Sequence, residues 1–389
     1  MAQERTQAPQ ACLACRQRKG RCDKLLPNCS FCLSKSLHCN YSHVGTVIAT
    51  NKHDLSFPVA FFLNHDAFHW RPKDFPPLGL HLPPYVASEL GDAAAITSIS
   101  QLYFDTVHLW MPIVSKRRFF EHVQQGLNET RADFALLCLS MKLITTIPST
   151  DSPDEHNPSY LSAKLLLHEV TMSRSLTVVT LQAIVILALY EIGHAIYPAA
   201  QVSVSLCAQY GLMLGLDWES LRQRSDLPWI ELEEQRRVWW AIVILDRYCS
   251  LGWSGRRPIT TGPRGEELLP CDDVAWDYGI VSSNETITTS APGRISMSRF
   301  ALLAQAALLL DKVLIHLRDD SMSKEYRDRE ATHLTNALKA LMTFTMQETT
   351  RRRIGPCGRT ALCYRGPKVV PDGHSQPTAT CEGGHAYDG

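Results

Sequence analysis

Residues 12–39 have the sequence CLACRQRKGRCDKLLPNCSFCLSKSLHC and hold six of the thirteen cysteines of this 389-residue chain. The spacing is C-x2-C-x6-C-x6-C-x2-C-x6-C, which divides the stretch into two similar halves. The six residues are Cys12, Cys15, Cys22, Cys29, Cys32 and Cys39. Chains shorter than about 40 residues usually need a disulfide or a metal, because they bury too little apolar surface to fold alone. The stretch therefore predicts a small module whose cysteines hold it together.

A metal accounts for this spacing better than disulfides do. Disulfide frameworks are typical of secreted chains, whereas Met1–Ala11 is polar and lacks the apolar core of a signal peptide. Two thiolates in a C-x2-C step converge on one ion, and soft thiolate ligands in tetrahedral geometry favour zinc. Basic residues between the cysteines also lower thiol pKa values and favour the thiolate form.

Six thiolates cannot supply two separate four-cysteine sites, but two zinc ions can each be tetrahedral if two sulfurs bridge both ions. In its spacing the stretch resembles the fungal binuclear zinc cluster, which is the DNA-binding domain of fungal transcription factors. The resemblance implies two zinc ions, with Cys12 and Cys29 as the bridging ligands. It further implies that Cys15 and Cys22 complete one site, and that Cys32 and Cys39 complete the other.

Basic side chains are concentrated in the same stretch. Six lysines and arginines stand against one acid, Asp23, although the whole chain has a formal net charge of zero. A short helix starting near Cys12 and ending near Gly20 would turn the cysteines inward and these side chains outward. Basic side chains neutralise DNA phosphates and bond guanine O6 and N7 in the major groove. The resemblance implies that Arg18 and Lys19 contact a CGG-type triplet. The predicted DNA-binding residues are Arg16, Arg18, Lys19, Arg21, Lys24 and Lys35.

The rest of the chain divides into a linker, a helical region and a tail. Residues 42–95 are rich in proline and show no sustained heptad repeat, so they predict a linker without a coiled coil. From 96 to 350 apolar residues recur at helical spacing, with prolines between the candidate helices. We expect 1–11 and 351–389 to be disordered. The candidate helices are 96–109, 116–126, 131–147, 158–174, 178–194, 199–214, 230–251, 297–318 and 324–347.

Neither a membrane protein nor an enzyme is predicted. The apolar run Ala183–Tyr190 is far shorter than the roughly 18 residues of a membrane span. The motifs G-x-S-x-G and H-E-x-x-H and a Walker loop are absent. Asp272 and Asp273 are adjacent, so they point in different directions and make a poor acid–base pair. Four later cysteines lie mostly in apolar context and predict core positions: Cys138, Cys207, Cys249 and Cys271.

The helical region resembles the regulatory middle domain of fungal zinc-cluster factors. The resemblance rests on the order of several short pieces, above all EQRRVWWAIVILDRY at Glu234–Tyr248. Charges on this apolar helix should form ion pairs within the protein, because charged side chains are rarely buried unpaired. Those charged residues are Arg236, Arg237, Asp246 and Arg247. The apolar stripe from Phe300 to Leu317 predicts helix–helix core, with dimerisation as the alternative.

Together these features predict a binuclear zinc cluster at 12–41, followed by a large all-α regulatory domain. The predicted function is that of a nuclear, sequence-specific transcription factor from a filamentous fungus, with DNA carrying CGG-type half-sites and the transcription machinery as partners. It would regulate RNA polymerase II transcription of a biosynthetic gene cluster and would form a homodimer through its helical domain. Two alternatives stay open: a DNA-binding repressor or competitor without an activation region, and a zinc-dependent protein-interaction module. The basic run before Cys22 argues against the latter.

Overall fold

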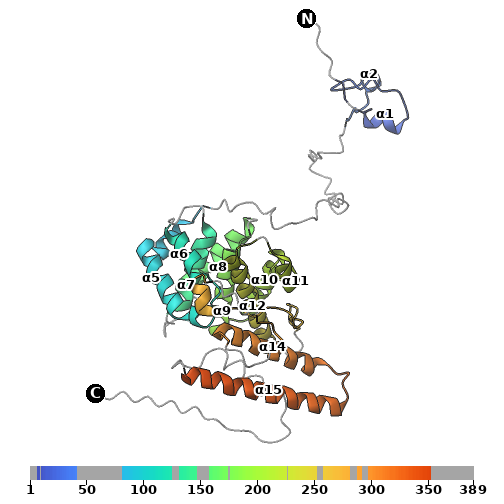
Figure 1. The fold of residues 1–389 in the computed structure, drawn as a ribbon. Coiled ribbons are helices and arrows are strands. Elements are labelled where there is room, and N and C mark those ends of the chain that lie inside the picture. The colour runs from blue at the N-terminus through green and yellow to red at the C-terminus, as the bar shows by residue number, and fades with distance from the viewer. Residues whose placement is uncertain are drawn as a thin grey trace. The chain divides into compact units, whose positions relative to one another are not determined.

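The computed structural model describes residues 7–8, 10–41, 81–124, 131–146, 157–173, 176–225, 227–251, 257–280, 287–290 and 297–351. Its contacts divide the chain into two compact units, one within Met1–His69 and the other within Trp70–Gly389 (Figure 1). Most of the expected linker, at 42–80, lies outside the described residues. The same holds for most of the expected N-terminal and C-terminal disorder, at 1–6 and 352–389.

The first unit repeats its structure as it repeats its sequence. Helix α1 (Leu13–Gln17) follows Cys12, and helix α2 (Ser30–Ser34) follows Cys29. Each of these two cysteines takes the N-cap position in an extended conformation, and the second cysteine of each C-x2-C step is buried on its helix. The exposed surfaces differ, because α1 and the turn after it carry Arg16, Arg18 and Lys19, whereas α2 presents the apolar Phe31 and Leu33.

The second unit is a bundle of helices. In its described part, regular structure outside the helices is limited to an isolated β-bridge between Leu268 and Thr288. The confirmed fold class is thus a metal-binding module followed by an all-α domain. The helices are α4 (Pro84–Leu90), α5 (Ala93–Asp105), η3 (Val107–Leu109), α6 (Lys116–Gln124), α7 (Ala132–Thr145), α8 (Pro158–Met172), α9 (Val178–Gly193), α10 (Ala199–Met213), α11 (Trp218–Gln223), α12 (Trp229–Leu251), α13 (Asp273–Asp277), α14 (Arg299–Arg318) and α15 (Lys324–Arg351).

Helix α9 lies at the centre of this bundle. It packs against α7, α10 and α12, and nearly every side chain of its apolar run Ala183–Tyr190 is buried. The helix begins where the Thr177 hydroxyl accepts a hydrogen bond from the N–H of Thr180, at 3.1 Å. A helix that is apolar on all sides is stable only when neighbours cover all sides, and this is the position that α9 occupies.

Helix α12 carries two of the largest buried side chains, Trp239 and Trp240, and neither is exposed to solvent. The indole N–H of Trp240 donates to the carbonyl of Leu268 at 3.0 Å. Against Trp239 lies Gly211 of α10, where an added Cβ atom would come within 2.8 Å of the indole ring. Glycine is therefore required at this position by the close approach of α10 to the tryptophan.

The charged residues of α12 form ion pairs within the unit, as the sequence predicts. Arg237 is fully buried between Glu233 and Asp273, at 2.9 and 2.8 Å, and its guanidinium lies 4.3 Å from the ring centroid of Trp276. Its Nη2 atom also donates to the carbonyl of Cys271 at 2.8 Å. Every charge here has a partner, which is the condition for burying it without a large cost.

A second buried pair lies further along α12. Arg247 contacts Asp246 at 3.0 Å and Asp311 of α14 at 2.5 Å. The Asp246 carboxylate accepts the N–H groups of Ile259 and Thr260, each at 2.8 Å. These bonds fasten the chain after α12 to the helix and join α12 to α14.

The adjacent carboxylates Asp272 and Asp273 point to different partners. Asp272 caps α13 by accepting the N–H of Ala275 at 2.9 Å, whereas Asp273 pairs with Arg237. The four later cysteines also follow expectation in large part. Cys138, Cys207 and Cys249 are buried, and Cys271 is partly buried.

The structure shortens the predicted linker. Residues 84–90 form α4, and α5 begins at Ala93, whereas the sequence places the start of the helical region at 96. Val86 and Leu90 of α4 are buried, and α4 packs against α7 and α8. A helix of two turns gives too short an apolar pattern to stand out beside several prolines, which explains the difference.

The Phe300–Leu317 stripe belongs to the core and does not offer a dimer surface. Phe300, Leu303, Leu310 and Leu314 are at most 4% exposed, because α14 packs against α12 on one side and α15 on another (Figure 1). Of the stripe, only Leu317 is exposed to a substantial degree, at 37%. The alternative prediction, that this stripe forms a dimer interface, is therefore wrong, since its apolar side chains already pack within the protein.

Two segments, Ala199–Gln223 and Arg299–Arg318, are long and apolar enough to cross a membrane by length and composition alone. In the most apolar part of each segment, 44% and 61% of the residues, respectively, are buried inside the protein. Core packing accounts for this apolar character, because helices at the centre of a bundle need apolar side chains on more than one face.

We predict that Trp239→Ala lowers the free energy of unfolding by about 3–5 kcal/mol, because it empties a fully buried site. Val202→Ala on α10 is the control: Val202 is 61% exposed, so the change should stay within about 0.5 kcal/mol. Urea unfolding of both variants measures the difference. Equal, small losses in the two variants would show that the indole does not support the core.

Candidate metal centre and nucleic-acid interface

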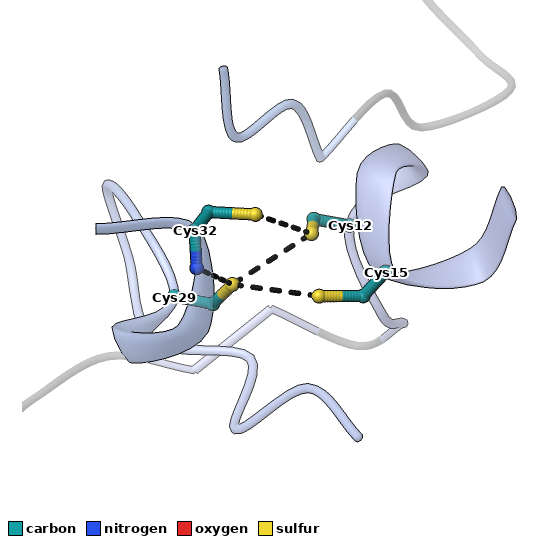
Figure 2. Close-up of side chains that lie close together, drawn as sticks. All are labelled: Cys12, Cys15, Cys29 and Cys32. Atoms are coloured by element: carbon teal, nitrogen blue, oxygen red, sulfur yellow. Dashed lines mark hydrogen bonds between the residues drawn. The ribbon is translucent and has the colours of Figure 1, made fainter. Parts of the chain in front are cut away.

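Four cysteine sulfurs converge at the centre of the first unit (Figure 2). The Sγ atom of Cys12 lies 3.7 Å from that of Cys29 and 3.6 Å from that of Cys32, and the sulfurs of Cys15 and Cys29 are 3.8 Å apart. A disulfide would place two sulfurs about 2.05 Å apart. A tetrahedron of thiolates at 2.3 Å from a zinc ion has edges of about 3.8 Å. These separations fit a shared metal.

The other two cysteines of the motif border this group. The Cys39 sulfur accepts the N–H of Cys29 at 3.2 Å, and Cys22 and Cys39 both pack against the buried four. The ligand atoms of Cys22, Asp23 and Cys29 also lie within 4.8 Å of one another. The structure thus brings all six predicted cysteines together, with Cys12 and Cys29 contacting members of both halves.

Burial works against ionisation of the sulfurs without a metal. Burial raises the pKa of the Cys15 thiol to about 12, and the neighbouring thiols add to this. For Cys29, burial is outweighed by hydrogen bonds, first from the backbone N–H of Cys32, and its pKa falls to about 6. Adjacent buried thiolates need a cation to offset their mutual repulsion. These cysteine sulfurs are therefore suited to bind a divalent metal ion that prefers sulfur ligands.

Asp23, the single acidic residue of the module, has a structural role that the sequence did not predict. Its carboxylate accepts the N–H of Ser30 at 3.1 Å, at the first turn of α2. Hydrogen bonds from the Ser30 side chain, and then from the backbone, hold the pKa of Asp23 below its usual value. Asp23 lies directly after Cys22, so it ties one half of the module to the helix of the other.

Residues just outside the cysteine motif complete the module, and sequence reasoning missed them. The Tyr41 hydroxyl lies 3.7 Å from the sulfur of Cys22. Burial, with the nearby sulfur of Cys22, raises the pKa of Tyr41, so the hydroxyl keeps its proton and can donate to a thiolate. The N–H of Leu13 donates to the carbonyl of Asn40 at 2.7 Å. The only feature of the sequence that could have indicated this contribution is an aromatic residue two positions after the last cysteine, and such a feature is weak evidence.

Four of the predicted DNA-binding residues, Arg16, Arg18, Lys19 and Arg21, form an exposed basic rim on α1 and just after it. Arg16, Arg18, Lys19 and Arg21 are exposed, as is Lys35, whereas Lys24 is partly buried. Helix α1 ends at Gln17, three residues before the expected end at Gly20. It is Lys19 that takes a left-handed conformation, with φ of 52°. The turn after α1 thus presents these side chains on a backbone fixed by the buried Cys15.

The sequence was compared with those of known proteins. Residues 10–44 match the fungal Zn(2)-Cys(6) binuclear cluster domain, and residues 100–343 match the fungal specific transcription factor domain. The transcription factor BOA15 of Botryotinia fuckeliana is 38% identical over 184 residues, which are 46% of this chain and 98% of that protein. No solved structure matches.

Two further relatives are longer than this chain. The pigment biosynthesis transcriptional activator pigB of Monascus ruber is 29% identical over 217 residues, covering 50% of this chain and 38% of pigB. The tropolone cluster transcription factor tropK of Talaromyces stipitatus is 24% identical over 330 residues, covering 69% of this chain and 59% of tropK. The chain thus spans less than two thirds of the length of each of these two proteins.

We predict that residues 1–45 fold only with zinc, because structural zinc contributes roughly 10–16 kcal/mol in small finger peptides. Native mass spectrometry of this peptide should show two zinc ions and six unoxidised cysteines. Adding EDTA should abolish its helical circular dichroism. A peptide that keeps its helices in EDTA, or that holds three disulfides in reducing buffer, would contradict the prediction.

We also predict that Tyr41→Phe loosens metal binding while the module still folds. The change removes only the hydroxyl near Cys22, and outer-shell hydrogen bonds are typically worth 10–100-fold in metal affinity. Transfer of zinc to a chromogenic chelator should become faster for one of the two ions. Ser34→Ala on the exposed part of α2 is the control and should leave both transfer rates unchanged. The same rate in Tyr41→Phe and wild type would exclude the role of the hydroxyl.

Proposed function

Because this chain belongs to the fungal zinc-cluster transcription factors, whose cluster domain binds two zinc ions, we propose that it is a nuclear regulator of RNA polymerase II transcription that binds CGG-type DNA. The observation that supports this most is the exposed basic rim of Arg16, Arg18, Lys19 and Arg21 beside the buried sulfurs. A rigid metal-centred module with one cationic edge is suited to a DNA groove.

For the metal centre we propose Cys12 and Cys29 as the bridging ligands. Their sulfurs are 3.7 Å apart, and each also lies within 3.8 Å of a sulfur in the opposite half. Cys15 and Cys22 would complete one zinc site, and Cys32 and Cys39 the other. The two ions supply the cross-links between α1 and α2 that the small core of this module cannot supply by packing.

For DNA recognition we propose a division of labour among the basic residues. Arg18 and Lys19 are exposed and lie where α1 has just ended, and they would reach base edges in the major groove. Arg16, Arg21, Lys24 and Lys35 would contact phosphates, which fix register and orientation without selecting sequence.

The helical domain would serve regulation, and we propose no catalytic role for it. Its two fully buried arginines, Arg237 and Arg247, are held in ion pairs within the bundle. Of the two longer relatives, one is named as a pigment biosynthesis transcriptional activator and the other as a tropolone cluster transcription factor. We propose that this chain likewise controls a biosynthetic gene cluster of its fungus. Mapping bound sites across the source genome tests this directly.

We predict that Lys19→Ala costs about 1–3 kcal/mol of binding on a CGG site and relaxes discrimination against a changed triplet. Lys35→Ala is the matched control on α2. It should weaken binding to all sequences alike and lower the salt slope by about one unit at most. Fluorescence anisotropy at several salt concentrations, on CGG and scrambled duplexes, separates the two. Equal losses on both duplexes for Lys19→Ala would assign Lys19 to phosphate contact instead.

We also propose that the protein binds DNA as a homodimer formed by its helical domain. One cluster contacts only about three base pairs, too few to select a site in a genome, and a dimer doubles the contacts. We expect residues 1–350 to sediment as a dimer and residues 1–60 as a monomer in analytical ultracentrifugation. If both are monomers with the same affinity for the same site, binding is monomeric.

A further inference from the structure

A cavity of about 440 Å³ opens among helices η3, α7, α9, α12 and α14 of the helical unit. Its aliphatic walls include Ile144, Leu189, Ile192 and Leu303. Around it the core is closely packed: Leu303 is 1% exposed, and Ile244, which also lines the cavity, is 3% exposed. Pockets that take small organic ligands span roughly 300–1,000 Å³, and this cavity lies within that range.

Among the described residues that line it, none is an aspartate, glutamate, lysine or arginine. A charged ligand would lose its hydration there without finding an opposite charge, and this cost is large. The ligand that suits the cavity is therefore uncharged.

Aromatic rings and a few polar atoms give the cavity further selectivity. Trp110 comes from the turn after η3, Tyr190 and His194 from the C-terminal end of α9, and Tyr248 from α12. The rings of Tyr190 and His194 are 4.1 Å apart between centroids. Aromatic rings pack well against flat aromatic ligands, and tyrosine hydroxyls and an imidazole can bond a ligand hydroxyl or carbonyl.

A larger cavity of about 570 Å³ in the same unit is less suited to a ligand. Its charged residues already pair with one another: Arg118 with Glu234, and Arg131 with Asp133 at 3.0 Å. The amide of Gln182 donates to Glu234 as well, at 3.0 Å. The larger cavity is thus lined by paired charges, whereas the smaller one is lined mainly by aliphatic and aromatic side chains.

We propose that the 440 Å³ cavity is a binding site for an uncharged, mainly aromatic small molecule that carries a hydroxyl or carbonyl group. Such a ligand would contact five helical elements at once. It would bind the folded bundle and not the unfolded chain, so it would raise the stability of the helical unit in proportion to its concentration. This binding does not depend on recognition of DNA.

The test uses the zinc-loaded full chain and two probes that share a ring system. The first, 1,8-dihydroxyanthraquinone, is uncharged and carries hydroxyl and carbonyl groups; the second, anthraquinone-2-sulfonate, is an anion. Titration followed by tryptophan fluorescence should show saturable binding of the dihydroxyanthraquinone at one site per chain. The melting temperature of the protein should rise when this probe is bound. The anion should bind at least tenfold more weakly. Absence of saturable binding of the uncharged probe, or equal binding of the two, overturns the proposal.

Variants then locate the site. Leu189→Trp fills the cavity from a partly buried position and should weaken binding of the uncharged probe at least tenfold. Leu165→Trp on α8 is the matched control, because Leu165 is 58% exposed and does not line the cavity; its affinity should equal that of the wild type. Tyr248→Phe removes only the hydroxyl group and keeps the ring. It should weaken binding of the uncharged probe severalfold. If Leu189→Trp does not fold, Tyr248→Phe decides, and unchanged affinity in that variant overturns the assignment.

Discussion

The first unit exists because six sulfurs must meet within a segment that has almost no other interior. Among its described residues the buried side chains are chiefly the cysteines themselves, with Ala8 and partly buried Leu37 and Tyr41 beside them. The sulfur–sulfur separations of 3.6–3.8 Å match the edge length of a tetrahedron of thiolates around a zinc ion. Both short helices have one of the buried cysteines, Cys12 or Cys29, as their N-cap, so the positions of α1 and α2 follow from where the sulfurs converge.

The helical unit depends on a different constraint, which is the pairing of charges inside an apolar bundle. Arg237 has Glu233 on its own helix and Asp273 at the start of α13, while Arg247 reaches Asp311 of α14. Removing one partner would leave an uncompensated buried charge, which is far more costly than the pair is stabilising. These pairs therefore act mainly to specify which helices lie together, while tryptophan packing supplies the stability.

The sequence predicted the long helices well because their apolar periodicity runs for several turns and prolines separate them; α7 and α9 agree with expectation to within two residues at each end. It failed on α4, α11 and α13, which are seven residues or fewer. The cysteine spacing predicted the convergence of sulfurs. It could not predict Tyr41 or Asp23, because their roles depend on how the chain returns to Cys22 and to α2, and that is a property of the folded backbone.

The two halves of the small module hold the same ligand pattern but different surfaces. Four residues after its first cysteine, one half has Arg16 and the other has Leu33, which is 69% exposed. Since neither side chain contributes to the interior, exchanging one type for the other costs the fold almost nothing. Stability and recognition are thus decoupled at these two positions: exposed residues such as Arg16 and Leu33 can be replaced to change what the surface binds, whereas Asp23 is held by its bonds to α2. The helical unit has no such freedom, because at Gly211 even one added methyl group collides with Trp239.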